Sequence, residues 1–514
     1  MNLGEPPQQL SDPKLRTKLA LNLFLLLTSV YLLTSSGNTV DVTDDAMLRY
    51  AVTESLIRER SFALRDEIGP RWGILGQDGR YYTKYGLGQS VLAIPFYLAG
   101  QRFGNPKFLI SSIGPILSAF TCVLLFSLAL RIGYSLKTAT ALGLIAGLCT
   151  QIWPEAKSPF DHHIETFFAL LCVYQAMAFW QERRQWRLLL AGASLGLAVL
   201  TRVTSVLWFA PLVVLLYLSC RQETAGTSRY KAFLRVGGLF GLGLAPWLAV
   251  LIWYNAVRFG SIFETGYSLW AAQKGFANFG NSLAVGLAGE LVSPGKGVLF
   301  YCPIFLLTLA GVRRFFLRQR ELGAVLVLAS ILYLLFFAKY KVWHGDIAWG
   351  PRYLTVLMPY WVLFAEPFLR RQWLSRVVVS ISFVFQLAAV MVDMNMHFAR
   401  LLRSGVIHDV ETYAYPTSLY FEVRHSPLLN RFAEIGQALN LIAGPRLEEV
   451  DRSGVPRAAP SVDFWWLRFS TEGTAPIVGW ILACPFMLEA VASGYRIRRL
   501  LKQATQVEAT LVLS

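Results

Sequence analysis

Apolar residues are gathered into long runs along the chain, separated by short polar and basic segments. Most runs are close to the roughly 20 residues that an α-helix needs to cross the hydrocarbon core of a bilayer. They span residues 19–35, 108–130, 138–153, 163–181, 188–202, 204–219, 233–254, 298–312, 321–339, 353–369, 376–394 and 474–493. The pattern predicts an all-α polytopic membrane protein with about 12 transmembrane helices, within a range of about 11 to 13.

One further apolar run, residues 86–103, decides which side the later segments face. If it does not cross the membrane, 23 Lys and Arg residues of the short connecting segments share one side, and if it crosses, all but the first three move to the other side. Short cytoplasmic loops are rich in Lys and Arg. We therefore predict that this run, with Pro95 inside it, is a juxtamembrane or re-entrant segment and that both termini are cytoplasmic.

This topology divides a single membrane-embedded unit into four parts. Residues 1–18 form a cytoplasmic N-terminal tail, and residues 474–514 form the last transmembrane helix and a cytoplasmic tail. The transmembrane core spans residues 19–394, with a first outside loop at 36–107 and a second at 154–162. Residues 395–473 form a periplasmic loop region that matches no soluble domain, and we expect this region to cover a cavity or select a substrate.

Composition narrows the classes of function. Of the 514 residues, 54% are apolar and 16% are charged, whereas soluble chains carry about 25% charged residues. A soluble enzyme is therefore excluded. The net charge of +16 is explained by basic cytoplasmic loops, so we expect no nucleic-acid partner. The six cysteines form no CxxC pair, which argues against structural zinc and disulfides.

Conspicuous ionisable residues gather in the first outside loop. Asp44 and Asp45 begin an amphipathic helical stretch, where carboxylates either cap the helix and favour its dipole or serve a reaction. Lys84 stands between Tyr82 and Tyr85 before the apolar run. A lysine at headgroup depth either anchors the chain at the interface or binds a phosphate.

A second set lies at the outer ends of later helices. Asp161, His162 and Glu165 stand at the mouth of a transmembrane helix, where ionisable groups are costly unless they are used or solvated. Asp161 and Glu165 are four residues apart and share a helix face. Arg202 and Arg352 require anionic partners, carbonyls or water, and His344 and Asp346 lie close to Arg352 in sequence.

Several segments in order resemble the GT-C class of polyprenyl-phosphate-dependent glycosyltransferases, especially bacterial relatives of protein O-mannosyltransferases and of the lipid A aminoarabinose transferase. The matching segments, from about residue 19 to 370, are TDDAMLRYA, YYTKYGLGQSVLAIP, GLAVLTRVTSVLWFAP, WYNAVRFGSIFETGYS, LVSPGKGVLFYCP and WGPRYLTVLMPY. The resemblance places Asp44 at the catalytic Asp and Lys84 at the family's Lys, although Tyr-Gly here replaces the common Pro-Pro. In the second loop Asp161, His162 and Glu165 compete for the acidic position.

The resemblance implies a GT-C-like core and a hexosyl- or pentosyltransferase, mannosyltransferase-like, that takes a sugar from undecaprenyl phosphate. The acceptor would be a cell-envelope lipid, glycan or protein at the outer face of the bacterial cytoplasmic (inner) membrane. Asp44 is the expected general base in an inverting reaction. The remaining site candidates are catalytic Asp45, Asp161 and Glu165; donor-phosphate ligands Lys84, Arg202 and Arg352; and substrate contacts Tyr82, Tyr85, His162, His344 and Asp346.

Three alternatives stay open at this point. A divalent cation could bind Asp44 with Asp161, His162 or Glu165, and no other cofactor is indicated; a nucleotide site is unnecessary because the lipid phosphate is already the leaving group. An oligosaccharide ligase or polymerase would use a diphosphate carrier instead. A lipid or solute transporter would place charged groups near the bilayer midplane, whereas the charged groups here collect toward one face.

Overall fold

The computed structural model describes residues 12–222, 228–346, 348–369, 373–393, 395–407, 415–441, 462–468 and 476–513. It is helical, as predicted. The helices of the first 222 residues are α1 (Pro13–Leu33), α2 (Asp44–Arg58), α3 (Gly69–Trp72), α4 (Gly88–Phe103), α5 (Pro106–Ser111), α6 (Ile113–Arg131), α7 (Leu136–Cys149), α8 (Ile152–Lys157), α9 (His162–Glu182), α10 (Trp186–Thr201), η1 (Val203–Trp208), α11 (Phe209–Ser219) and η2 (Cys220–Gln222).

The later helices are α12 (Arg229–Phe259), α13 (Tyr267–Gln273), α14 (Leu283–Val292), α15 (Val298–Tyr301), α16 (Phe305–Arg318), α17 (Arg320–Lys339), η3 (Arg352–Leu357), α18 (Met358–Ala365), η4 (Glu366–Phe368), α19 (Trp373–Met391), α20 (Asn395–Arg403), η6 (Thr417–Phe421), η7 (Val423–His425), α21 (Pro427–Ala438), α22 (Trp465–Arg468) and α23 (Pro476–Leu513). Strands β1 (Ile74–Leu75) and β2 (Tyr81–Tyr82) pair antiparallel, with Ile74 opposite Tyr82.

Each of the twelve apolar runs coincides with helix, although five of them are divided into shorter pieces. Residues 298–312 divide into α15 and α16 at Pro303, and residues 353–369 divide into η3, α18 and η4. A proline lacks the backbone N–H that continues a helix and clashes with the preceding turn. The apolar pattern predicts where helix forms. Pro303 accounts for the break between α15 and α16, whereas the breaks at Ser112 and Thr150 occur without a proline.

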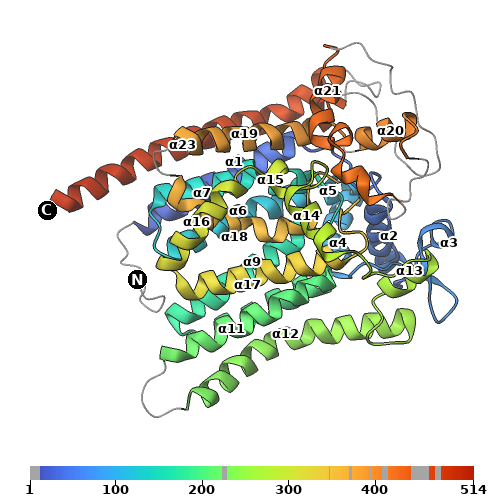
Figure 1. Ribbon diagram of the computed structural model, residues 1–514, viewed down its shortest axis with the longest axis horizontal. Coiled ribbons are helices and arrows are strands. Elements are labelled where there is room, and N and C mark those ends of the chain that lie inside the picture. The colour runs from blue at the N-terminus through green and yellow to red at the C-terminus, as the bar shows by residue number, and fades with distance from the viewer. Residues whose placement is uncertain are drawn as a thin grey trace.

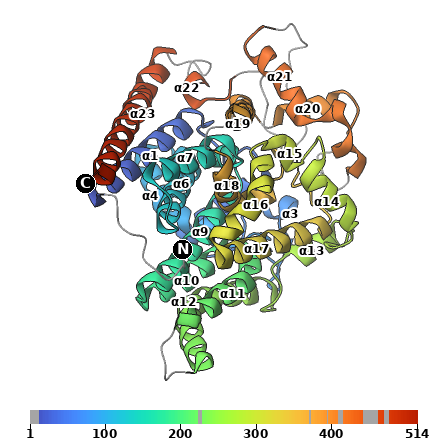
Figure 2. The same cartoon turned by 60° about the vertical axis from the view of Figure 1, so that its left-hand side comes forward.

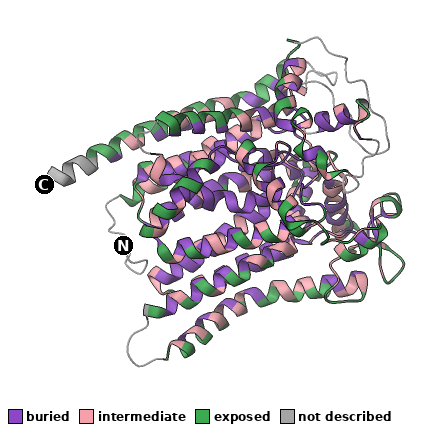
Figure 3. Ribbon diagram, viewed as in Figure 1, coloured by how far each residue is buried: buried purple, intermediate pink, exposed green. Residues whose placement is uncertain are grey.

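Six helical segments among the described residues are long and apolar enough to cross a membrane: Pro13–Leu33, Pro106–Arg131, Arg229–Phe259, Arg320–Lys339, Trp373–Met391 and Ile477–Gln506. Much of α12 and α23 is exposed (Figure 3), including large apolar side chains such as Leu242 and Val491. Exposed apolar surface on this scale fits lipid rather than water. The chain is a membrane protein, and the total of about 12 crossings stays a prediction.

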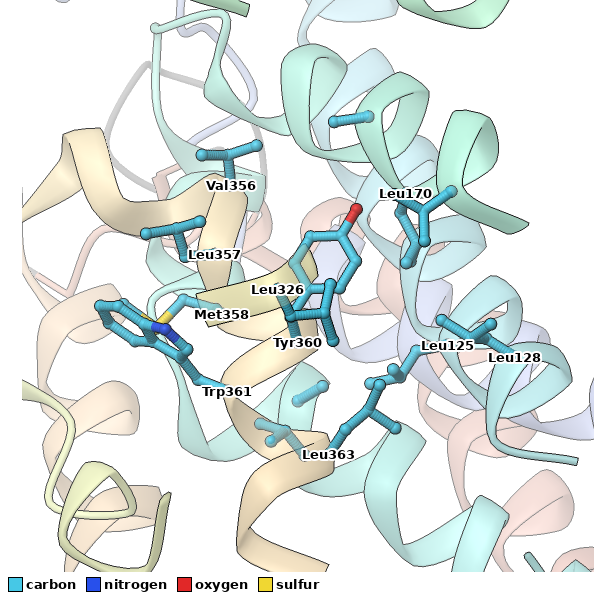
Figure 4. Close-up of a cluster of buried hydrophobic side chains, with 14 of the residues drawn as sticks. Leu125, Leu128, Leu170, Leu326, Val356, Leu357, Met358, Tyr360, Trp361 and Leu363 are labelled. Atoms are coloured by element: carbon cyan, nitrogen blue, oxygen red, sulfur yellow. The ribbon is translucent and has the colours of Figure 1, made fainter. Parts of the chain in front are cut away.

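The long helices run side by side, with α12 at one edge and α23 beside α1 at the other (Figures 1 and 2). The short helix α18 lies at the centre, and all its residues are buried. Tyr360 and Leu363 of α18 pack among Leu170 of α9, Leu326 of α17 and Leu125 of α6 (Figure 4). Lipid tails are as apolar as Leu, so the hydrophobic effect does not drive helices together within a bilayer. Close van der Waals packing of this kind holds them together instead.

The bundle has two chemically different ends. Near the start of α1 and the end of α23 (left in Figure 1), connecting turns carry ion pairs such as Arg131–Glu182, 2.8 Å, and Arg318–Glu366, 3.0 Å. The helices α2, α3 and α13 lie at the opposite end. The basic connecting segments of the sequence therefore lie at one end of the bundle, and α2, α3 and α13 lie at the other. That the Arg-rich end faces the cytoplasm stays a prediction.

The described parts of residues 395–473 are bonded to the core at the α2 end. Lys157 of α8 pairs with Asp463 at 2.8 Å. The indole N–H groups of Trp465 and Trp466 donate to the last carbonyls of α1, those of Leu32 and Leu33, at 2.9 and 2.8 Å. Segments far apart in sequence thus close over the same end of the bundle.

Close packing of α10 against α12 depends on glycine. A Cβ added to Gly243 would lie 2.1 Å from the carbonyl oxygen of Leu189, whereas one added to Gly241 would meet nothing within 4 Å. We expect Gly243→Leu to destabilise the protein by about 1–3 kcal/mol through overpacking, measured as a lower melting temperature in detergent. Gly241→Leu, on the same helix, is the matched control. Equal melting temperatures for the two variants would contradict this packing.

Candidate functional site

A cavity of about 700 Å³ opens at the α2 end of the bundle. The start of α2, the segment after β2, α13, the end of α17 and the segment 340–353 all contribute to its wall. Five cations and three carboxylates line it among the residues that the structure describes: Arg71, Lys84, Arg202, Lys274, Arg352, Asp44, Asp45 and Asp346. Such convergence of charge in a membrane protein marks a functional site.

The acidic pair stands in the first turn of α2 without serving as its cap. The N-cap is Thr43, whose hydroxyl accepts a hydrogen bond from Ala46 N at 3.3 Å. Both Asp44 and Asp45 line the cavity. Burial and the neighbouring carboxylate of Asp45 raise the pKa of Asp44 to about 6, although Lys84 opposes the shift. A carboxyl with this pKa is suited to exchange a proton near neutral pH.

Lys84 projects into the cavity from the segment that follows β2. Its ammonium lies 3.5 Å from the centroid of the Trp270 ring on α13 and 5.2 Å from that of Tyr85. Burial lowers the pKa of Lys84, while the carboxylates of Asp45 and Asp44 act in the opposite direction. The guanidinium of Arg258 donates to the Thr83 carbonyl just before it, which fixes the backbone at this point.

Arg202, at the end of α10, reaches the cavity with its charge already compensated. Its Nη1 lies 2.7 Å from Asp161 Oδ1, and its Nε lies 3.1 Å from Glu165 Oε2. Asp161 also pairs with Arg49 of α2 at 3.1 Å, and Tyr333 donates to Glu165 at 3.0 Å. Burial raises the pKa of Asp161, but Arg202 and Arg49 outweigh it and the pKa is lowered. Asp161 and Glu165 therefore form a buried network behind Arg202.

Arg352 and Asp346 pair across the wall that the segment 340–353 contributes. Arg352 Nη2 lies 2.9 Å from Asp346 Oδ2, and the guanidinium covers the ring of Phe160 at 3.6 Å. The backbone N–H of Asp346, a residue at φ +58°, donates to His344 Nδ1 at 3.2 Å. His344 itself stacks on Tyr420, with centroids 4.3 Å apart, outside the cavity wall.

The structure brings together only part of the predicted site. The predicted residues that line the cavity are Asp44, Asp45, Lys84, Tyr85, Arg202, Asp346 and Arg352. Those outside its lining are Tyr82, Asp161, His162, Glu165 and His344. The hydroxyl of Tyr82, for example, donates to Asp78 at 2.7 Å. Sequence proximity does not predict membership of the lining, because Tyr82 stands two residues from Lys84 and His344 two residues from Asp346.

Other residues of the site carry weaker sequence signals. Arg49, 3% exposed, follows Asp45 by one helical turn, on the buried side of α2. A buried arginine on that face could have indicated a carboxylate partner. Asn395, at the start of α20, lines the cavity and donates to the Val42 carbonyl at 3.2 Å, next to the helix start that bears Asp44.

Two of the three predicted partners of Asp44 in a cation site are already paired with arginines. Within the described part of the chain, no group of three or more His, Cys, Asp or Glu side chains converges as metal ligands. Asp161 and Glu165 are engaged by Arg202, and Asp161 also by Arg49. Because guanidinium groups occupy these carboxylates, they are not free to join Asp44 around a cation.

No model of a known protein family matches the chain, and no curated protein matches it in sequence. Solved structures that are similar include ArnT from Cupriavidus metallidurans bound to undecaprenyl phosphate, 15% identical, covering 83% of this chain and 81% of that chain with a TM-score of 0.48. The same protein in the apo state has a TM-score of 0.49 at 14% identity, covering 84% and 83%.

The oligosaccharyltransferase of Archaeoglobus fulgidus in the apo form is also similar, at 14% identity and a TM-score of 0.48, covering 84% of this chain and 66% of that chain. These solved structures are of GT-C glycosyltransferases, the class that the sequence motifs resemble. At identities of 14–15% and TM-scores below 0.5, these similarities do not assign a function to the chain.

The buried network behind Arg202 makes a prediction for stability. Asp161→Ala leaves two buried guanidinium groups without their shared carboxylate, so we expect a loss of about 3–5 kcal/mol, measured as a lower melting temperature in detergent. Asp41→Ala removes an exposed pair with Lys107, 2.7 Å long, and should cost about 0–1 kcal/mol. A similar melting temperature for both variants would show that the network does not support the fold.

Proposed function

We propose that the protein is an inverting membrane glycosyltransferase that moves a sugar from a polyprenyl phosphate to an acceptor hydroxyl. The observation that carries the proposal is one cavity in which Asp44, with a pKa of about 6, faces the cations Lys84 and Arg352. A proton acceptor and a pair of phosphate-binding cations are what displacement of a phosphate by a hydroxyl requires.

In the proposed reaction, the carboxylate of Asp44 accepts the proton of the acceptor hydroxyl as its oxygen attacks the anomeric carbon. The bond between that carbon and the phosphate oxygen breaks, and its electron pair leaves with the lipid phosphate. Lys84 and Arg352 stabilise the negative charge that develops there. Attack and departure on opposite sides of the carbon invert its configuration.

The remaining charged residues take supporting roles in this proposal. Asp45 raises the pKa of Asp44, while Asp161 and Glu165 orient Arg202 at the cavity wall through their ion pairs. Arg202 contacts the phosphate as a third cation, and Tyr85 and Asp346 contact the substrates. No divalent cation takes part, so EDTA should leave the rate unchanged.

A lipid-linked donor is supported by the apolar part of the cavity wall. Val206, at the start of the η1–α11 span, and Phe336, Phe337 and Tyr340, at the end of α17, line the cavity beside its charged residues. Val206 is 54% exposed, so this wall continues into the apolar surface of the bundle. An isoprenoid chain can lie along it while its phosphate reaches Lys84.

The proposed setting follows from the charge asymmetry. With the Arg-rich end in the cytoplasm, both termini are cytoplasmic and the cavity opens at the outer face of a bacterial inner membrane, where undecaprenyl phosphate is the carrier. The acceptor is a cell-envelope lipid, glycan or protein, and the sugar is a hexose or a pentose. A diphosphate-linked glycan donor defines the competing ligase or polymerase function.

Donor identity provides the decisive experiment. Purified protein with a membrane extract as acceptor is incubated with radiolabelled polyprenyl-phosphate sugars, and release of free polyprenyl phosphate is measured. We expect Asp44→Asn to lower release by at least 10²–10⁴-fold, because the proton acceptor is lost, while binding of the donor is retained. Consumption of a diphosphate-linked glycan instead would favour the ligase, and normal turnover by the variant would exclude Asp44 as the base.

The pKa of Asp44 also predicts the pH dependence of kcat/KM. Because the base acts when deprotonated, kcat/KM should fall about tenfold per pH unit below pH 6. Asp45→Asn removes a negative neighbour that raises this pKa, so the acid limb should move to lower pH. Lys84→Gln removes a cation that lowers it, so the limb should move to higher pH. Shifts in the same direction for the two variants would refute the assignment.

A further inference from the structure

The last helix, α23, carries exposed basic side chains at the Arg-rich end of the bundle, away from the cavity. It has 38 residues, and it extends past the neighbouring helices at that end (Figure 1). At a rise of 1.5 Å per residue, its length is about 57 Å, nearly twice the roughly 30 Å of the hydrocarbon core of a bilayer. Part of α23 therefore lies outside the hydrocarbon.

Exposed apolar side chains mark the part of α23 that faces lipid. They begin with Ile477, 63% exposed, and end with Tyr495, 69% exposed. Between these two residues the helix rises about 27 Å, close to the thickness of the hydrocarbon core. Tyrosine is enriched where the hydrocarbon meets the headgroups. The membrane boundary at the Arg-rich end therefore lies near Tyr495.

Three cations of α23 follow this boundary directly. Arg498, Arg499 and Lys502 are all exposed, and we call them the basic patch. Along the helix axis they stand about 5–10 Å beyond Tyr495, and their long side chains can reach back to the headgroups. Residues three and four apart on a helix have Cβ atoms about 5–6 Å from each other. Lys502 is therefore a neighbour of both arginines.

The other face of the same stretch is held against the bundle. Ile497, Leu501 and Ala504 follow one another at intervals of four and three residues and pack on the main hydrophobic core. The basic patch is thereby turned outward. In the described part of the chain no carboxylate pairs with its three cations, whereas Arg496, closer to the bilayer, pairs with Glu489 at 2.9 Å.

Helix α1 adds two cations at a similar depth. It packs antiparallel along α23 (Figure 1), and Asn22 Oδ1 lies 3.4 Å from Arg496 Nη1. Lys18 and Lys14, both exposed, stand about one and two turns before Asn22, alongside the turns of α23 that carry the basic patch. Asp12 caps α1 by accepting from Lys14 N at 2.9 Å. Positive charge therefore predominates where the two helices leave the hydrocarbon.

We propose that the basic patch, with Lys14 and Lys18, binds the headgroups of anionic phospholipids in the leaflet at the Arg-rich end. Arg binds a phosphate through its planar fork and Lys as a point charge, and basic residues next to a transmembrane helix are attracted to anionic lipids. Leu488 and Val491, 66% and 74% exposed, give the acyl chains an apolar surface on the same helix. The inference requires that α23 crosses the membrane and is independent of glycosyl transfer.

Binding of two lipids that differ in headgroup charge tests the basic patch. Phosphatidylglycerol and phosphatidylcholine with the same acyl chains are titrated onto the full-length protein in detergent, and Kd is measured by native mass spectrometry. We expect phosphatidylglycerol to bind about tenfold or more tightly than phosphatidylcholine, and this preference to weaken as the salt concentration rises. The triple variant Arg498→Gln/Arg499→Gln/Lys502→Gln should reduce the preference about fivefold or more.

A matched variant controls for the overall charge of the protein. Arg60→Gln/Arg80→Gln/Lys341→Gln also removes three positive charges, from exposed residues near the α2 end that do not line the cavity. Because these residues are separated from the basic patch by more than the Debye length of about 10 Å, the variant should change the Kd of phosphatidylglycerol less than about twofold. Melting temperatures without added lipid check that both triple variants fold.

Three outcomes would overturn the inference. The two lipids bind equally, the preference for phosphatidylglycerol persists unchanged in Arg498→Gln/Arg499→Gln/Lys502→Gln, or the preference is lost in Lys84→Gln instead, which would place the anionic lipid in the cavity. Failure of the proposed function is distinguishable from all three, because neither lipid carries a sugar to transfer. A protein that transfers no sugar yet selects phosphatidylglycerol through the basic patch would still support the lipid site.

Discussion

The site depends on one buried carboxylate shared by two arginines. Asp161 binds Arg49 of α2 and Arg202 at the end of α10, and it is 2% exposed itself. Charges buried this deeply are tolerated only when paired. The pairing therefore fixes the first outside loop, the mouth of α9 and the end of α10 in a single arrangement. Asp44 lies on the same helix, five residues before Arg49, so this contact also helps to place it at the cavity.

Neutralisation by partners divides the acidic residues of the site into two groups. Asp161 and Glu165 are both paired with guanidinium groups, and at Asp161 these lower the pKa and favour the charged form. Asp44 lies close to Asp45, and its pKa is raised to about 6. The contrast follows from environment rather than residue type, because all four are carboxylic acids near helix N-termini.

The bundle supports this chemistry by keeping it at one end. Helices α1 and α23, α10 and α12, and α6 and α9 pack along their lengths, with glycines such as Gly243 allowing backbones to approach closely. Charged side chains near the Arg-rich end form their own ion pairs. The described segments of the 395–473 region close over the other end, where Asn395 joins the cavity wall. The cavity wall at this end is thus built both from the bundle and from a segment of the 395–473 region.

Features that repeat locally along the chain could be read from it directly. Runs of apolar residues specify helices, and the distribution of Lys and Arg distinguishes the two ends, because both depend on near neighbours or on composition. The acidic pair at Asp44 and the isolated Lys84 were found in the same way. Which carboxylate is neutralised was decided only by the folded structure, since Arg49 and Asp161 stand 112 residues apart. The contact of Trp270 with Lys84 likewise joins distant segments, and no local periodicity encodes contacts of that range.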